Sequence, residues 1–183
     1  AYNSLMDDGR SLSDLKQGVT LEVFGEGTSP GPSGNIKDNS YVSFGEAMQK
    51  LEDNGVSPNI ASYLGAATVR IQEIGYANRK ATDEEMESMR DIVKSAMEEG
   101  AIGIGSSLIY APGDYADTDE LVELSKVASS YGGRYISHMR NEDSRILSAV
   151  DELIEIAEKA DIPAEIYHLT ASRKANSHLL DSV

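Results

Sequence analysis

The sequence predicts an α/β fold in which parallel strands alternate with helices. Short β-like runs alternate with longer amphipathic stretches, which gives about five β/α units. Two of the runs end on histidine, at His138 and His168, and one long amphipathic stretch separates them. This alternation fits either a doubly wound sheet or a piece of a (β/α)₈ barrel. A whole barrel typically needs ~250 residues, whereas the chain has 183.

The first units begin with two short strands and one helix. The run 20–24 alternates apolar and polar residues before a loop rich in Gly, Pro and Ser, as a half-buried strand does. A second strand is expected over 59–64, ending at Gly65. Between them, the run 44–54 places its apolar residues at helical spacing and is followed by Gly55, which is a common helix stop.

The middle of the chain predicts a capped helix followed by a strand of small residues. Thr82 precedes the helix and Glu85 stands three residues later, which is the pattern of a capping box. Methionines and other apolar residues then recur at helical spacing up to Gly100, and we interpret them as core packing. The next strand is expected over 101–105.

The second half repeats the unit twice more. A helix capped by Asp117 or Thr118 is expected to run to about residue 131, followed by a strand over 134–138. A further amphipathic helix is expected from residue 146 to about residue 157. Pro163 then opens the strand that leads to His168.

Composition excludes several classes of protein. The net charge is −15, from 31 acidic and 16 basic residues, so the chain should repel phosphate backbones and nucleic-acid binding is not expected. There is no cysteine, hence no disulfide and no thiolate ligand. No apolar run is long enough to predict a membrane-spanning helix. The chain does not begin with Met or a signal peptide, so we expect an internal segment. We favour the cytoplasm and leave the periplasm and secretion open.

Two histidines and one glutamate are the candidate metal ligands. His138 and His168 each follow a strand, at the end where ligands bind in parallel β/α proteins. Two imidazoles placed in this way could share a metal, and the alternative is a pair of structural histidines. Glu26 lies between Gly25 and Gly27 after the first strand, where a carboxylate could bind metal or simply occupy a turn.

Two other residues are candidate substrate contacts. Tyr110 lies in a Pro/Gly loop after a strand and could cover a substrate and donate a hydrogen bond, or could be half-buried packing. Arg140 lies two residues after His138. It could orient the site, or it could pair with Glu142.

Five motifs together are distinctive: Gly25-Glu26-Gly27, Tyr110-Ala-Pro-Gly113, Tyr115-Ala-Asp-Thr118, His138-Met-Arg-Asn-Glu142 and Ile166-Tyr-His168. A chain with these motifs resembles the D-aminoacylase (N-acyl-D-amino-acid deacylase) branch of the amidohydrolase superfamily. The resemblance covers nearly the whole chain and implies a distorted, metal-dependent (β/α)₈ barrel that hydrolyses amide bonds. Residues 1–183 would then form a single partial barrel domain, comprising about strands two to six and truncated at both ends.

The resemblance also implies roles for individual residues. His138, His168 and Glu26 would bind Zn²⁺ or another divalent metal, and Tyr110 would line the site for a small N-acyl amino acid or related amide. The family's His-x-His pair and its catalytic Asp have no counterpart here; the Asp is expected beyond Val183. The chain would therefore contain no catalytic base and be inactive alone. Rival hypotheses are an inactive barrel fragment and an α/β binding domain, and the oligomeric state stays open.

Overall fold

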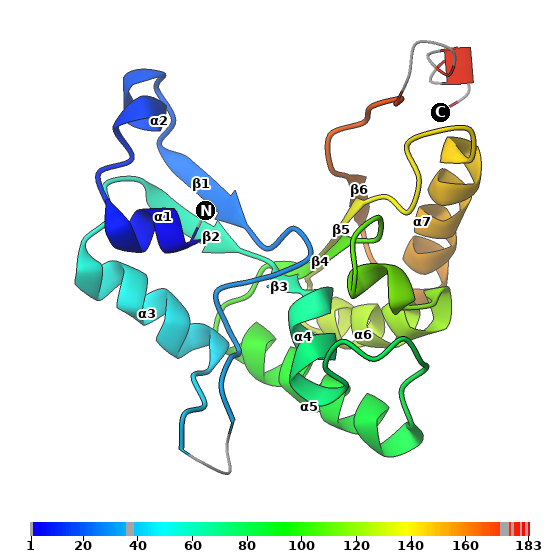
Figure 1. Cartoon of the computed structure of the whole chain (residues 1–183), viewed down its shortest axis with the longest axis horizontal. Helices are drawn as coiled ribbons and strands as arrows, with labels where there is room; N and C mark the ends of the chain where they lie inside the picture. The colour runs from blue at the N-terminus through cyan, green and yellow to red at the C-terminus, as the bar shows by residue number, and fades with distance from the viewer. Residues whose placement is uncertain (1, 36–38, 173–175, 177, 180, 182) are drawn as a thin grey trace.

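The computed structural model describes residues 2–35, 39–172, 176, 178, 179, 181 and 183. Parallel strands alternate with helices along these residues (Figure 1). The helices are α1 (Tyr2–Asp7), α2 (Leu12–Lys16), α3 (Phe44–Asn54), α4 (Ala66–Glu73), α5 (Asp83–Glu98), α6 (Thr118–Ser130) and α7 (Ile146–Ala160), with a 3₁₀ turn, η2, at Gly113–Tyr115. The strands are β1 (Leu21–Phe24), β2 (Asn59–Ser62), β3 (Leu64–Gly65), β4 (Gly103–Ser107), β5 (Arg134–His138) and β6 (Ala164–Ile166).

The strands pair in the order in which they occur in the sequence, and every pair is parallel. β1 pairs with β2, and β3, β4, β5 and β6 form a second ladder in that order. Only Tyr63 separates β2 from β3, and its backbone N–H donates to Phe24 O at 2.9 Å. The strand expected over 59–64 is thus interrupted at one residue. Sequential parallel pairing of this kind is the order found in a barrel wall.

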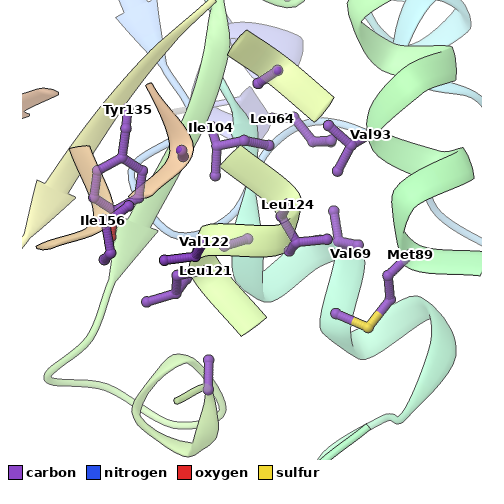
Figure 2. Close-up of a cluster of buried hydrophobic side chains, with 14 of the residues drawn as sticks. Leu64, Val69, Met89, Val93, Ile104, Leu121, Val122, Leu124, Tyr135 and Ile156 are labelled. Carbon is purple, nitrogen blue, oxygen red and sulfur yellow. The ribbon is translucent and has the colours of Figure 1, made fainter. Parts of the chain in front are cut away.

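The main core lies between the β3–β6 ladder and helices α4 to α7, which lie on the same side of it in Figure 1. Figure 2 shows Ile104 and Tyr135 from the strands meeting Val93 of α5, Leu124 of α6 and Ile156 of α7. All five side chains are fully buried. Burying a large apolar side chain contributes about 1.5–3 kcal/mol, so this layer fixes the helices to the strands. The doubly wound alternative, which places helices on both faces of the sheet, is therefore wrong.

Local capping interactions set the helix starts. Thr82 and Glu85 form the expected capping box at α5, and Ser43 and Glu46 form another at α3. Asp117 caps α6 by accepting the backbone N–H of Glu120 at 2.9 Å. Each cap satisfies a donor that the first helical turn leaves free.

Two expected strands differ from the observed ones at their ends. The strand expected over 101–105 is β4 at 103–107, because Ala101 N–H donates to Ala96 O at 2.9 Å and completes the last turn of α5. The strand expected from Pro163 ends at residue 166. His168 follows in a left-handed backbone conformation, with φ of 34°.

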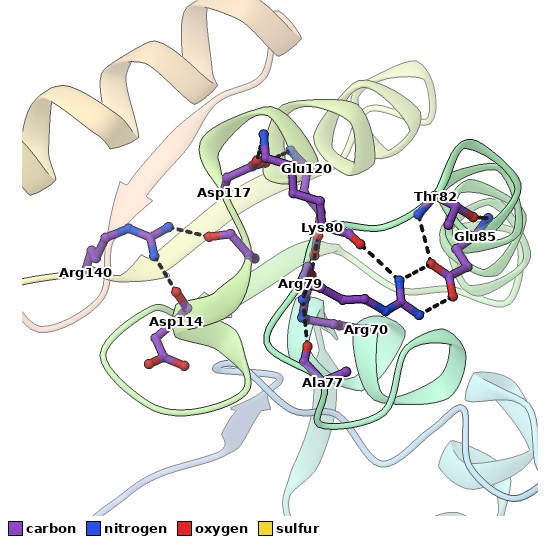
Figure 3. Close-up of polar contacts among 11 residues, drawn as sticks. Arg70, Ala77, Arg79, Lys80, Thr82, Glu85, Asp114, Asp117, Glu120 and Arg140 are labelled. Carbon is purple, nitrogen blue, oxygen red and sulfur yellow. Dashed lines mark hydrogen bonds and ion pairs between the residues drawn. The ribbon is translucent and has the colours of Figure 1, made fainter.

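A buried ion pair joins α4 to α6 beneath the strand ends (Figure 3). Arg70 Nη1 donates to Glu120 Oε2 at 2.5 Å, and the two side chains are 1% and 5% exposed. Arg70 Nη2 also donates to the carbonyls of Ala77 and Arg79. Burial raises the pKa of Glu120, and the hydrogen bond and charge of Arg70 oppose that effect.

The described part of the chain contains no helix with the length and apolar character needed to cross a bilayer.

Candidate metal centre

Glu26 lies on a sharply turned loop at the end of β1. Gly25 and Gly27 flank it with φ of 101° and 76°, a region that glycine adopts without steric cost. The loop packs closely on its neighbours: a Cβ on Gly25 would lie 2.2 Å from Tyr63 O, and a Cβ on Gly105 would lie 2.0 Å from Gly25 O. Small residues thus let the loop lie over β4 and carry the Glu26 carboxylate toward β5.

His138 is the last residue of β5 and is held by its neighbour strand. It pairs with Ser107 in the β4–β5 ladder, and its carbonyl accepts the backbone N–H of Leu108 at 2.9 Å. Its imidazole Nδ1 lies 2.8 Å from Glu26 Oε1. The ring is buried, and its Nε2 has no hydrogen-bond partner in the part of the chain that the structure describes.

His168 lies beyond the end of β6, where Tyr167 N–H donates to Ser137 O at 2.9 Å and keeps the chain alongside β5. Its left-handed backbone is uncommon outside glycine, and such residues cluster at functional sites. Its Nε2 lies 3.2 Å from Glu26 Oε1. Partial burial lowers the pKa of His168, but the hydrogen bond to Glu26 and the charges of Glu26 and Glu142 give a net increase above the ordinary value.

The three predicted ligands meet at one point. Their donor atoms all lie within 4.8 Å of one another, and the two imidazole rings pack edge to face with centroids 4.4 Å apart. Zinc bonds of 2.0–2.2 Å in a tetrahedral shell place neighbouring ligand atoms about 3.3 Å apart. The separations of 2.8 and 3.2 Å from the Glu26 oxygen to the two nitrogens therefore fit a divalent ion after a small adjustment. One carboxylate and two imidazoles are a donor set that zinc accepts.

A second carboxylate, which the sequence did not reveal, lies against the same two rings. Glu142 Oε1 is 3.3 Å from His168 Nδ1 and 3.7 Å from His138 Nε2. The spacing of four residues between His138 and Glu142 could have indicated a contact between them, but the sequence offered a pairing of Glu142 with Arg140 instead. That alternative is wrong, because Arg140 has other partners.

Tyr110 lies at the mouth of the site. Its side chain is 64% exposed, and its ring centroid is 5.4 Å from that of His138. An exposed phenol beside a buried imidazole can contact a bound molecule, so the substrate contact predicted for Tyr110 stays a prediction that this position permits.

Arg140 points toward the helix layer and the η2 turn. Nε and Nη2 donate to the two carboxylate oxygens of Glu152, each at 2.8 Å. Its guanidinium also donates to the carbonyls of Asp114 and Ala116 (Figure 3). These bonds fix the segment between Tyr110 and α6. The predicted substrate contact of Arg140 gains no support from them and stays a prediction.

A cavity adjoins the carboxylate side of the site. Its volume is about 570 Å³, and Phe24, Glu26, Pro30 and Tyr167 are among the residues that line it. This volume lies within the range of small-molecule sites, which is about 300–1,000 Å³. Glu26 therefore borders space for a small molecule, although His138 and His168 do not line this cavity.

Comparison with known proteins agrees with this geometry. No protein-family model matches the chain. D-aminoacylase from Alcaligenes xylosoxydans xylosoxydans is 32% identical over 154 residues, which are 82% of this chain and 32% of that enzyme. A solved D-aminoacylase, described for its binuclear metal centre, superimposes with a TM-score of 0.89 at 26% identity over 99% of this chain and 41% of its own.

The chain is similar to part of D-aminoacylase. The resemblance to the D-aminoacylase branch of the amidohydrolases is thereby confirmed, as is the partial (β/α)₈ barrel fold. An N-acyl-D-glutamate deacylase from Bordetella bronchiseptica, solved with zinc and a phosphonate inhibitor, shares the fold with a TM-score of 0.80 at 23% identity over 97% of this chain and 41% of its own. The chain spans about a third of the length of the curated D-aminoacylase.

Proposed function

We propose that this chain supplies part of the barrel and metal site of an amidohydrolase that removes the acyl group from N-acyl-D-amino acids. The observation that carries the proposal is the convergence of Glu26, His138 and His168 at the carboxyl ends of parallel strands. The similarity to D-aminoacylase supplies the reaction class and the class of substrate.

The proposed ligands have complementary properties. Neutral His138 and His168 would each give one nitrogen, and Glu26 would give a carboxylate oxygen and a negative charge. Zn²⁺ is the ion we propose, since these N and O donors suit it and a related deacylase fold was solved with zinc. When bound, such an ion supplies Lewis-acid activation of an amide carbonyl and of water.

Other residues would bind the substrate and move protons. We propose that Tyr110 covers the amide next to His138, because its exposed phenol can donate a hydrogen bond there. The general base is proposed to be an aspartate outside residues 1–183. Loss of a positioned base typically lowers the rate ~10²–10⁴-fold, so residues 1–183 alone should have little activity.

The function is tested by assaying the intact protein with zinc and a panel of N-acetyl-D- and N-acetyl-L-amino acids. We expect turnover of D-substrates that disappears in His138→Ala and after chelation. Glu158→Ala, on the exposed side of α7, is the matched control and should be fully active. Activity that survives both His138→Ala and chelation would contradict the proposal.

A further inference from the structure

Glu142 and Glu26 approach the two imidazole rings at different nitrogens. The nitrogen near Glu26 is Nδ1 in His138 and Nε2 in His168. The nitrogen near Glu142 is the other one in each ring, Nε2 in His138 and Nδ1 in His168. The two rings therefore lie between two carboxylates, and each carboxylate lies near one nitrogen of each ring.

The Glu142 carboxylate is more buried than the Glu26 carboxylate and lies against the inner nitrogen of His138. Its side chain is 14% exposed, compared with 32% for Glu26. The buried Nε2 of His138 has no hydrogen-bond partner in the described part of the chain, and a carboxylate oxygen lies 3.7 Å from it. A small movement of either group would make this contact a hydrogen bond.

The segment that carries Glu142 is fixed on both sides. Arg140 is bound to Glu152 through two hydrogen bonds of 2.8 Å. Asn141 Oδ1 accepts the backbone N–H groups of Asp143 and Arg145, each at 3.0 Å. These contacts hold the backbone at residue 142 and so restrict where its carboxylate can lie.

We propose that Glu142 is a positioning residue that, when the metal is bound, accepts hydrogen bonds from His138 Nε2 and His168 Nδ1 and thereby fixes the orientation of both rings. A neutral imidazole carries one proton. In the metal-bound form Nδ1 of His138 and Nε2 of His168, the nitrogens that lie 2.8 and 3.2 Å from Glu26 Oε1, would give their lone pairs to the metal, and the ring protons would lie toward Glu142. A carboxylate has enough lone pairs to accept both bonds. The inference rests on the proposed metal site and adds to it a partner shared by the two histidines.

Replacing Glu142 should weaken the metal site while leaving its ligands in place. Loss of an outer hydrogen-bond partner of a metal-binding histidine typically lowers metal affinity 10–100-fold. We expect Glu142→Ala to lower Zn²⁺ affinity by about that factor. Glu142→Gln should lose less, because its amide oxygen can still accept one ring N–H.

The experiment measures Zn²⁺ affinity of the intact protein by competition with a chelating dye, and solvent exchange of the ring N–H protons of the zinc-loaded protein by ¹⁵N–¹H NMR of histidine. In the wild type the protons on His138 Nε2 and His168 Nδ1 are expected to exchange slowly, because both are hydrogen-bonded to Glu142. In Glu142→Ala both ring protons should exchange faster. Glu158→Ala removes one exposed carboxylate from α7 and should change neither measurement. Circular dichroism without metal should show that the Gln variant is folded.

The outcomes separate the two proposals. If the wild type does not bind zinc, or if His138→Ala binds zinc as well as the wild type does, the metal site itself is wrong. If the wild type binds zinc at His138, and Glu142→Ala binds it equally well with unchanged exchange of the ring protons, the metal site stands and the role of Glu142 is overturned.

Discussion

Breaking the buried pair of Arg70 and Glu120 by removing one partner should cost much more stability than breaking a surface ion pair. Both side chains are almost completely buried and 2.5 Å separates their charged atoms. Replacing Arg70 with Met leaves Glu120 without its cation and also removes the donor to the carbonyls of Ala77 and Arg79. An unpaired buried charge costs about 3–5 kcal/mol, so Arg70→Met should lower the free energy of unfolding by that amount near pH 8.

The cost should depend on pH. Burial raises the pKa of Glu120 and Arg70 opposes that increase, so removing Arg70 raises the pKa of Glu120 further. A carboxyl with a raised folded pKa loses its contribution as pH rises from the unfolded to the folded value. Arg70→Met should therefore be closer to wild type at pH 5 than at pH 8.

Urea unfolding at both pH values measures these differences. The double variant Arg70→Met/Glu120→Met should be less destabilised than the sum of the two single variants, because paired removal leaves no lone buried charge. Strict additivity of the two single effects, or a cost below about 1 kcal/mol for Arg70→Met, would refute the reasoning, since values that small are typical of exposed pairs.

Three further predictions concern the site and its supports. Gly105→Ala should destabilise the fold by about 1–3 kcal/mol and weaken zinc binding, because its Cβ would lie 2.0 Å from Gly25 O and displace the loop that carries Glu26; unchanged urea midpoint and zinc affinity would contradict this. Thr82→Ala should cost about 1 kcal/mol in urea unfolding, because the side chain caps α5 by accepting Glu85 N–H at 3.2 Å; the conservative Thr82→Ser should retain most of that stability. Zinc affinity, measured by dye competition, should decrease as the pH falls through a value above the ordinary pKa of histidine. The reason is that the pKa of His168 is raised and a protonated ring cannot bind metal. Zinc affinity that stays constant as the pH falls below 6 would contradict this prediction.

The sequence predicted most of the fold because local signals were strong. The bounds of α3 and β5 agree with expectation at both ends, and the α5 capping box lies where Thr82 and Glu85 placed it. α1, α2 and α4 were not predicted. α4 follows β3 directly at Gly65, without a capping side chain or a loop to mark its start.

The three candidate ligands could be predicted from the sequence, but the contact of Glu142 with them could not. Glycines around Glu26 and strand-end histidines are local features that a sequence displays. The contact of Glu142 with both rings depends on where the segment after His138 turns. That turn is fixed by tertiary bonds from Arg140 to Glu152 and to the carbonyls of Asp114 and Ala116, which no local pattern encodes.

The central claim is that Glu26, His138 and His168 bind one divalent ion. A crystal of the zinc-soaked protein, measured at the zinc absorption edge, tests it directly. We predict an anomalous peak about 2.0–2.2 Å from a Glu26 carboxylate oxygen, His138 Nδ1 and His168 Nε2. A map with zinc bound elsewhere, while Glu26 stays hydrogen-bonded to both imidazoles, would contradict the account.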